Sequence, residues 1–258
     1  MEHKGFAGGT GLPHRGTDGR RKMPRACAKI RASLIVMGCD GMSATAFSIS
    51  AHEAGLILAS TSPYRRELLA RLRLPFACVA PAVDEARLPN EAPAAMAHRL
   101  ALAKAQAVAR LYPAAVVIGS DQVAELNGQP LGKPHTHDRA RLQLQQQRGQ
   151  TVLFHTAVAV VRHAAGFAAS DMATIRTRFR SEQDGMSDAA IEAYLHAEQP
   201  YDCAGSIKSE GLGIALMAGI DNDDPTALIG LPLMRTCTLL QAAGLRILPV
   251  ADVKGPAA

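Results

Sequence analysis

Aromatic residues are scarce in this sequence: they make up 4% of its 258 residues, and tryptophan is absent. Proteins that bind single-stranded RNA commonly stack its bases on aromatic side chains that are interleaved with basic residues. No strand-like stretch here combines the two. The composition therefore argues against an RNA-binding protein, and we expect no nucleic acid partner.

Cysteines are few and lack the spacing of a structural site. They are odd in number, far apart and free of any C-x-x-C pair, at Cys27, Cys39, Cys78, Cys203 and Cys237. A disulfide framework or a zinc site needs paired or closely spaced cysteines. The pattern indicates a reducing cytosol, so we expect a cytoplasmic protein.

Long hydrophobic runs are missing, and so are the glycine-rich loops of two common nucleotide-binding folds. No run reaches the length of a membrane span, so we expect no membrane partner. The absence of G-x-x-x-x-G-K-[ST] and G-x-G-x-x-G argues against a P-loop protein and a dinucleotide-binding fold. His135 and His137 flank one residue in a predicted turn, and we expect them to face solvent rather than a metal.

Basic charge is concentrated near the N-terminus. Residues 1–50 hold eight Lys/Arg and three Asp/Glu, whereas residues 51–258 hold twenty of each, so the first segment accounts for the net charge of +5. That segment has no helix or strand period, and its composition is typical of disorder. We expect a disordered or non-native extension over residues 1–50, with a targeting segment as the alternative. The folded domain is predicted over residues 55–250.

Strand-like and helix-like patterns alternate from residue 56 onward, which predicts an α/β fold. Asn127-Gly128 between two short extended runs predicts a β-hairpin. Predicted extended segments are 56–60, 76–81, 115–121, 151–163, 167–180 and 211–218, and predicted helices are 63–74, 93–111, 136–148, 187–198 and one from near Pro232.

The stretch "LILASTSPYRRELL", residues 56–69, runs from a buried strand through a hydroxyl-rich turn into a helix. Free backbone N–H groups, the positive end of the helix dipole and the hydroxyls of Ser60 and Ser62 would meet there, which favours phosphate binding. A bound anion would also explain a basic residue such as Arg65 in the first helical turn. The alternative is that Ser62 is an ordinary helix cap and that the arginines form a solvated face.

Further polar residues follow apolar stretches, as side chains of α/β active sites do. Asp121 closes the predicted strand "AAVVIGSD", so its carboxylate needs either a metal or a buried partner, and a structural ion pair remains open. Lys104 lies in an alanine-rich helix and could instead extend into solvent. The other clusters are "VDE" with Asp84 and Glu85, "GKP" with Lys133, and "GSIKSEG" with Lys208 and Glu210.

Together these stretches, with "HRLALAKAQAV" and "YDCAGSIKSEGLGIAL", resemble the Maf family of nucleoside triphosphate pyrophosphatases over about residues 55–249. The resemblance implies a Maf/Ham1-like fold, in which a mixed, elongated sheet with flanking helices forms two lobes around a nucleotide cleft. It also implies a homodimer and metal-dependent hydrolysis of a nucleoside triphosphate to the monophosphate and diphosphate.

Three positions resemble the family subgroup that acts on 7-methyl-GTP: Tyr64, Gln122 and Glu210. That subgroup commonly has tryptophan at the first position, so Tyr64 departs from it but keeps an aromatic ring. Methylation at N7 makes guanine cationic, and a cationic ring stacks well on an aromatic face. Glu210 could accept hydrogen bonds from the guanine N1–H and amino group.

The resemblance also implies roles for individual residues. Asp121 would be the general base, and Asp121 and Glu85 would hold Mg²⁺ or Mn²⁺, with Asp84 a weaker candidate. Ser60 and Ser62 would donate hydrogen bonds to phosphate. The cations that would neutralise the triphosphate and the leaving diphosphate are Arg65, Lys104, Lys133 and Lys208.

Two other functions stay open. One is a pyrophosphatase that acts on nucleotides of the dTTP or UTP type. The other is a non-catalytic nucleotide-binding regulator of septum formation, although binding alone does not require a water-activating carboxylate such as Asp121.

Overall fold

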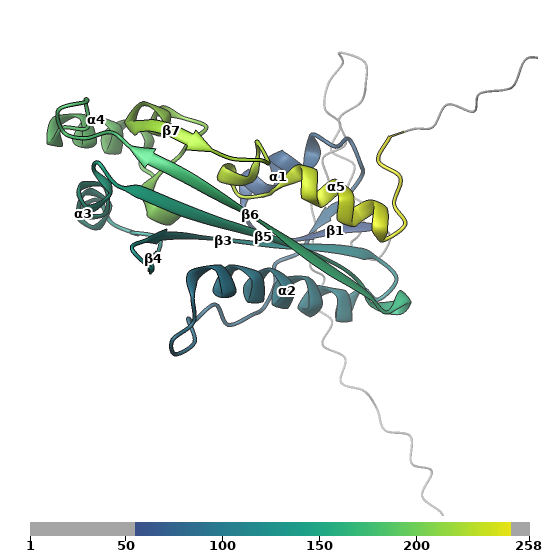
Figure 1. Ribbon diagram of the computed structural model, residues 1–258. Helices are drawn as coiled ribbons and strands as arrows, with labels where there is room; N and C mark the ends of the chain where they lie inside the picture. Colours follow the sequence, from purple (N-terminus) through teal and green to yellow (C-terminus); the bar gives the residue numbers. More distant parts are fainter. Residues whose placement is uncertain (1–54, 249–258) are drawn as a thin grey trace, which may run out of the picture. The chain divides into compact units, whose positions relative to one another are not determined.

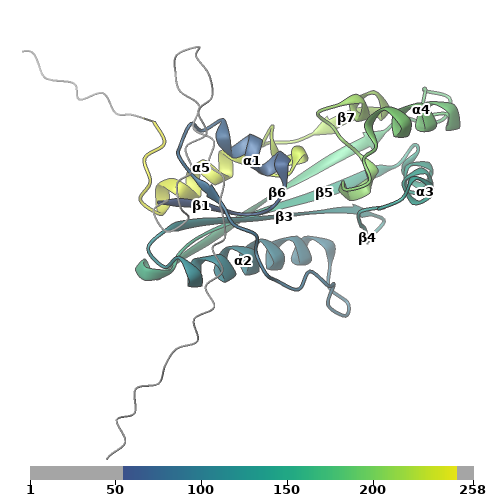
Figure 2. The same ribbon diagram turned by 180° about the vertical axis from the view of Figure 1, so that it is seen from behind.

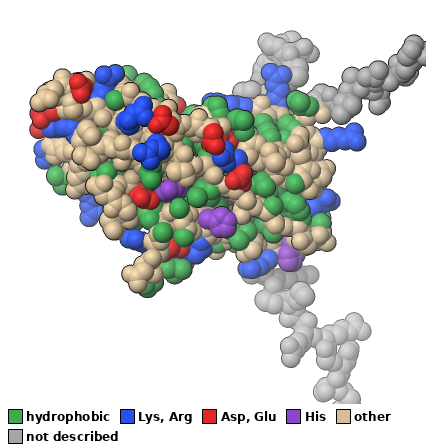
Figure 3. Space-filling model, viewed as in Figure 1, with side chains coloured by type: hydrophobic (Ala, Val, Ile, Leu, Met, Phe, Trp, Pro, Cys, Tyr) green, Lys and Arg blue, Asp and Glu red, His purple; other side chains and the backbone are tan. Residues whose placement is uncertain are grey.

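A computed structural model describes residues 55–248 (Figure 1). The expectations for residues 1–50 and for the last two residues of the predicted domain lie outside the described residues. No helix in the described range is long and apolar enough to cross a membrane. Acidic and basic side chains are interspersed on the face shown in Figure 3, as expected for the neutral part of the sequence.

The sheet has seven strands in the order β2-β1-β3-β5-β6-β7, with β4 paired to β3. β1 is parallel to β2 and β3, and the other pairs are antiparallel. This mixed sheet with its helices confirms the predicted α/β fold. The strands are β1 Leu56–Ala59, β2 Ala77–Cys78, β3 Val116–Leu126, β4 Gln129–Leu131, β5 Thr151–Arg162, β6 Phe167–Phe179 and β7 Met217–Asp221.

Helices cover both faces of the sheet at its β1 end, as Figure 1 shows. α2 packs on one face through one apolar cluster, and α1 and α5 pack on the other face through a second cluster. A third cluster joins α3, α4 and the far ends of β5 and β6. Figure 2 shows these helices and strands from behind. The helices are α1 Pro63–Ala70, α2 Pro93–Leu111, α3 His137–Gln147, α4 Asp188–Glu198 and α5 Leu233–Ala242.

The helix α2 lies unusually close to β3 because small residues meet at the contact. Ala101 and Ala105 are fully buried there, opposite Gly119 of β3. A Cβ atom on Gly119 would lie 2.2 Å from the carbonyl oxygen of Ala101, so only glycine permits this approach. The close contact brings the next charged residues of both elements, Lys104 and Asp121, together.

Local sequence signals placed several elements correctly. The predicted helix 93–111 coincides with α2, and Ser187 caps α4 by accepting a hydrogen bond from the Ala190 N–H at 3.2 Å. Asn127 and Gly128 both have positive φ, of 51° and 78°, as the predicted two-residue hairpin turn requires.

Other predicted bounds were wrong. α1 ends at Ala70 rather than at residue 74, and the chain turns through Arg73, whose φ is +56°. β2 is two residues long, Ala77–Cys78. The segment 211–218 was predicted as extended, but Leu212–Leu216 is a 3₁₀ helix and only then does β7 begin.

β3 also differs from its prediction, with a consequence for the site. The strand does not end at Asp121 but continues to Leu126. On one edge β3 pairs with β1 as far as Gly119 and with β4 from Ala124. Residues 120–123 therefore form an open stretch of strand edge between two short neighbouring strands, and Asp121 lies in the middle of it.

Candidate active site

A cavity of about 870 Å³ lies at this open edge of β3. Its walls come from the β1–α1 turn, α2, the β3–β4 hairpin and the segments near Asp202 and Leu228. Ten of the predicted site residues line it: Ser60, Ser62, Tyr64, Arg65, Glu85, Lys104, Asp121, Gln122, Lys133 and Glu210. The fold thus gathers residues that are up to 150 positions apart in the sequence.

The β1–α1 turn forms one end of the cavity. Ser62 caps α1, since its Oγ accepts a hydrogen bond from the Arg65 N–H at 3.4 Å, and the Ser60 Oγ accepts one from the Ser62 N–H at 3.1 Å. Arg65 does not belong to a solvated face: its Nε donates to the Gly230 carbonyl at 2.9 Å. The guanidinium is thereby held beside the N-terminus of α1.

Lys104 lies between two carboxylates. Its Nζ is 2.6 Å from Asp121 Oδ1 and 2.8 Å from Glu85 Oε1, and Lys104 itself is 5% exposed. The lysine therefore does not extend into solvent, which was one of its two sequence interpretations. The carboxylates of Asp121 and Glu85 both contact the Lys104 ammonium, so their oxygen atoms lie close together. Carboxylate oxygens are the ligands that a hard divalent metal ion prefers, so this pair fits such an ion.

Charges around this group alter the pKa values of its members. Burial by itself raises the pKa of Glu85, but the hydrogen bond and charge of Lys104, with the charges of Lys133 and Arg65, lower it below its ordinary value. Burial lowers the pKa of Arg65, and the charges of Asp121 and Glu85 oppose that shift. Glu85 is thus kept ionised by the same cations that would face a triphosphate.

The loop that carries Glu85 is tied to α2 by an arginine. Arg99 donates to both oxygens of Glu91, at 2.5 and 2.8 Å, and to the Ala86 carbonyl at 3.0 Å. The hydrogen bond from Arg99 lowers the pKa of Glu91 to about 2. The hydrogen bond from Arg99 to the Ala86 carbonyl holds the backbone next to Glu85, and the bidentate pair with Glu91 holds the end of the same loop.

The three predicted specificity residues also line the cavity. Burial raises the pKa of the Tyr64 hydroxyl, and the neighbouring Cys203, Asp202 and Glu210 raise it further, so Tyr64 and Glu210 lie at the same end of the cavity. Burial, followed by the charge of Asp202, raises the pKa of the Cys203 thiol to about 12, so that thiol stays protonated.

Gln122 is held by its amide nitrogen. Nε2 lies 2.9 Å from Thr156 Oγ1, 3.0 Å from the Ala227 carbonyl and 2.9 Å from the Leu228 carbonyl. Since these acceptors engage the amide N–H groups, the Gln122 Oε1 is the atom left to meet a ligand in the cavity that Gln122 lines.

Lys208 does not line the cavity, and neither does the weaker metal candidate Asp84, whose Oδ1 accepts a hydrogen bond from the Ala86 N–H at 2.9 Å. Lys208 contacts α4 instead. Its Nζ donates to the Glu198 carbonyl at 2.7 Å, at the end of α4. The lysine side chain is thus directed toward α4 in this structure.

Sequence reasoning missed the segment that follows β7, although its carbonyl groups support the site. The carbonyls of Ala227 and Leu228 hold Gln122, and the carbonyl of Gly230 accepts from Arg65 and, at 3.1 Å, from Ser120 Oγ. Backbone carbonyls leave no residue-type signal in a sequence. Arg87, His135 and Cys203 line the cavity as well and were also missed as site residues.

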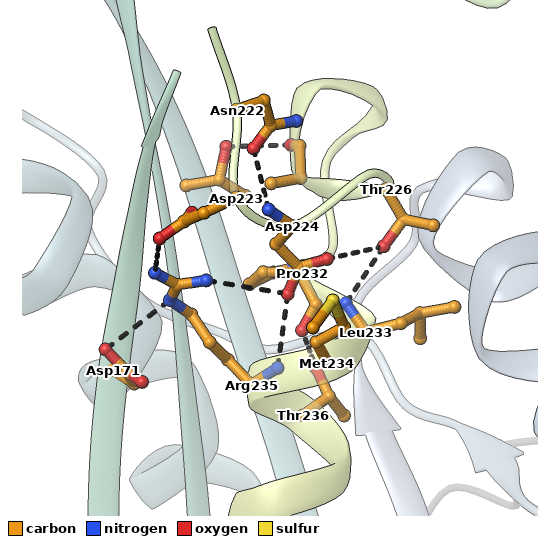
Figure 4. A network of polar contacts seen from close by, with 12 residues as sticks. Asp171, Asn222, Asp223, Asp224, Thr226, Pro232, Leu233, Met234, Arg235 and Thr236 are labelled. Carbon is orange, nitrogen blue, oxygen red and sulfur yellow. Dashed lines mark hydrogen bonds and ion pairs between the residues drawn. The ribbon is translucent and has the colours of Figure 1, made fainter.

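A polar network fixes this segment to the start of α5, as Figure 4 shows. The carboxylate of Asp224, which is fully buried, accepts from the Arg235 N–H at 3.1 Å and lies 3.2 Å from Thr226 Oγ1. Thr226 Oγ1 in turn accepts from the Leu233 N–H at 2.9 Å. The Arg235 side chain reaches Asp223 at 2.9 Å and Asp171 of β6 at 3.6 Å.

Comparison with known proteins agrees with this geometry. Residues 55–243 match the family model described as "Maf-like protein". Three curated relatives carry the name "7-methyl-GTP pyrophosphatase". The protein from Polaromonas sp. is 62% identical over 205 residues, which cover 80% of this chain and 92% of the relative. The protein from Albidiferax ferrireducens is 64% identical over 193 residues, or 75% and 95% of the two chains. The protein from Burkholderia pseudomallei is 53% identical over 206 residues, or 79% and 93%.

Proposed function

Because the chain belongs to the Maf-like protein family, we propose that it is a nucleoside triphosphate pyrophosphatase that hydrolyses 7-methyl-GTP to 7-methyl-GMP and diphosphate. The observation that carries the proposal is the convergence of Asp121 and Glu85 on Lys104 in a cavity that Tyr64 and Glu210 also line. The names of the relatives support the choice of substrate.

The triphosphate would lie against the N-terminus of α1. The positive end of the helix dipole favours an anion there, and Arg65 and Lys133 add two positive charges at the cavity wall. The hydroxyls of Ser60 and Ser62 are the remaining donors of this turn. Only placed cations and donors are needed, since phosphoryl transfer is catalysed mainly by position and charge.

Asp121 acts as the general base in this proposal. Its Oδ1 is engaged by Lys104, so a water proton would go to the other carboxylate oxygen. The water oxygen forms a bond to the α-phosphorus while the bond from that phosphorus to the bridging oxygen of the β-phosphate breaks. The electron pair leaves with diphosphate, whose charge Arg65, Lys104 and Lys133 offset.

A divalent cation, Mg²⁺ or Mn²⁺, would be held by Glu85 and Asp121. Their carboxylate oxygens are the donor type that these ions prefer. When bound, the ion supplies positive charge to the phosphate oxygens. Glu85 is suited to this role because the surrounding cations lower its pKa and keep it ionised.

Selection of the base would follow from Tyr64, Glu210 and Gln122. Tyr64 offers an aromatic face to the cationic 7-methylguanine ring. Glu210 accepts from the N1–H and amino group, a donor pair that a pyrimidine does not present. Gln122 adds a carbonyl oxygen whose direction is set by the segment near Ala227 and Leu228.

The test is diphosphate release by the purified full chain with Mg²⁺, comparing kcat/KM for 7-methyl-GTP, GTP, UTP and dTTP. We expect the highest value for 7-methyl-GTP. A preference for UTP or dTTP would keep the reaction and overturn the substrate. No release from any of the four, with nucleotide binding retained in a filter assay, would favour the non-catalytic regulator.

The proposal also covers the domain bounds, the compartment and the oligomeric state, as expected from the sequence. Residues 55–250 form the Maf-like domain, residues 1–50 are an extension outside it, and the enzyme acts in the cytoplasm as a homodimer. The family resemblance supports the homodimer, and light scattering on the purified chain tests it. A mass equal to one chain would overturn it.

A further inference from the structure

A second group of potential ligands lies between α3 and α4, away from the cavity. His137 begins α3 and contacts Glu192 of α4, so the sequence-based expectation that it faces solvent was wrong. Glu192 and His196 lie four residues apart on one side of α4. The three donor atoms lie within 4.8 Å of one another. None of the three residues lines the candidate active site.

The carboxylate of Glu192 is the centre of the group. Its Oε2 is 2.8 Å from His137 Nε2 and 3.8 Å from His196 Nε2. Its other oxygen, Oε1, lies 3.7 Å from Arg141 Nε. The arginine therefore faces the oxygen that the imidazoles do not use, and Oε2 stays directed between the two rings.

Tyr201 supports His137 from the other side of the ring. Its hydroxyl lies 3.1 Å from His137 Nδ1. A tyrosine hydroxyl can donate to Nδ1 or accept from it, so it stabilises either neutral tautomer. Without an ion, Nε2–H donates to Glu192. When the proton moves to Nδ1, the Nε2 lone pair becomes free, and Tyr201 then accepts from Nδ1–H as a supporting partner of a metal-ligating histidine does.

We propose that His137, Glu192 and His196 bind one divalent transition-metal ion, Zn²⁺ for preference. Two imidazoles and one carboxylate suit zinc, with water in the fourth position, whereas Mg²⁺ prefers oxygen ligands. Tetrahedral zinc with bonds of about 2.0–2.1 Å separates its ligand atoms by roughly 3.3 Å. The distance of 3.8 Å between Glu192 Oε2 and His196 Nε2 is longer than this separation. A small rotation of the His196 side chain, which is 77% exposed, would shorten it.

The ion would connect the start of α3 to α4 and so stabilise the folded protein, because a ligand that binds only the native state raises the free energy of unfolding. The group does not depend on the proposed catalysis. Hydrolysis of nucleotides can therefore fail as a proposal while the zinc site stands, and the reverse also holds.

The test is Zn²⁺ affinity of the full chain, measured by competition with a chromophoric chelator near neutral pH. His196→Gln removes an exposed ligand with little risk to folding, and His163→Gln, at an exposed histidine outside the group, is the matched control. We expect His196→Gln to weaken binding by at least about tenfold and His163→Gln to leave it unchanged. Equal affinities in the two variants would overturn the proposal.

Two further measurements distinguish Zn²⁺ binding at this group from Zn²⁺ binding at the cysteine thiols, and a metal site from histidines that have only a structural role. Tyr201→Phe, which removes the hydroxyl next to Nδ1, should weaken Zn²⁺ binding by about tenfold while the circular dichroism spectrum is retained. X-ray absorption at the zinc edge should report nitrogen and oxygen ligands. Sulfur ligation, or a Tyr201→Phe affinity equal to wild type, would contradict the assignment.

Discussion

Lys104 and Asp121 form a buried ion pair, with 2.6 Å between Nζ and Oδ1, where α2 crosses β3. The pair exists because Gly119 lets α2 approach the strand. A buried charge without a partner would be strongly destabilising, so each residue requires the other. Glu85 adds a second carboxylate on the solvent side of the same lysine, at 2.8 Å.

Asp121→Asn should reduce kcat for 7-methyl-GTP by about 10²- to 10⁴-fold, the usual contribution of a general base. The amide keeps an oxygen for Lys104 but cannot take a proton from water. Nucleotide binding should remain close to wild type in an equilibrium assay. Asp138→Asn, at an exposed carboxylate at the start of α3, is the matched control. Near-wild-type turnover by Asp121→Asn would remove this residue from the role of base.

Tyr64→Ala should lower the ratio of kcat/KM for 7-methyl-GTP to that for GTP by about 2- to 30-fold, the range expected from losing a cation–π contact. Tyr64→Phe keeps the ring and should keep the ratio. Steady-state kinetics on both nucleotides provide the measurement. Equal losses on GTP and 7-methyl-GTP in Tyr64→Ala would show that the ring does not select the methylated base.

The parts of the fold that the sequence predicts correctly depend on neighbouring residues. The proline and alanine pattern of α2, the Asn127-Gly128 turn and the Ser187 cap are local signals, and the structure agrees with each. The 3₁₀ helix Leu212–Leu216 was missed because its apolar residues read equally well as a strand. Periodicity over so few residues does not separate the two.

The features that the sequence did not predict, or predicted wrongly, are set by residues far apart in the sequence. β3 extends past Asp121 because β5 pairs with it up to Glu125, a partner that no local pattern reveals. The burial of Lys104 follows from Gly119, and the direction of Gln122 from carbonyls more than a hundred residues away. The motifs, taken together, predicted the residues that line the cavity. The hydrogen bonds and close packing that hold these residues in place involve distant parts of the sequence and were found only in the structure.

Asp224→Ala should destabilise the fold by about 3 kcal/mol or more, since it removes the acceptor of the Arg235 N–H and the buried carboxylate that lies 3.8 Å from the Arg235 guanidinium. The same change frees the segment whose carbonyls hold Gln122, so base selectivity should fall more than kcat. Urea unfolding and the 7-methyl-GTP to GTP ratio are the two measurements. Asp223→Ala removes the neighbouring exposed carboxylate and serves as the control. Unchanged selectivity in folded Asp224→Ala would limit Asp224 to stability.

Glu91→Gln should make the free energy of unfolding vary less with pH in the acid range. The pKa of Glu91 is about 2 in the folded chain and about 4.3 in an unfolded one. The folded state therefore favours the ionised carboxylate, and this contribution is complete above about pH 5 and is lost as pH falls toward about 2. The difference in unfolding free energy between wild type and Glu91→Gln should accordingly be constant from about pH 7 to 5 and then shrink below about pH 5.

Urea titrations across this pH range test the Glu91 prediction, with Glu67→Gln, which changes an exposed carboxylate of α1, as the control. A difference that stays constant down to about pH 3 would mean that Arg99 does not hold Glu91 in solution as it does in the structure.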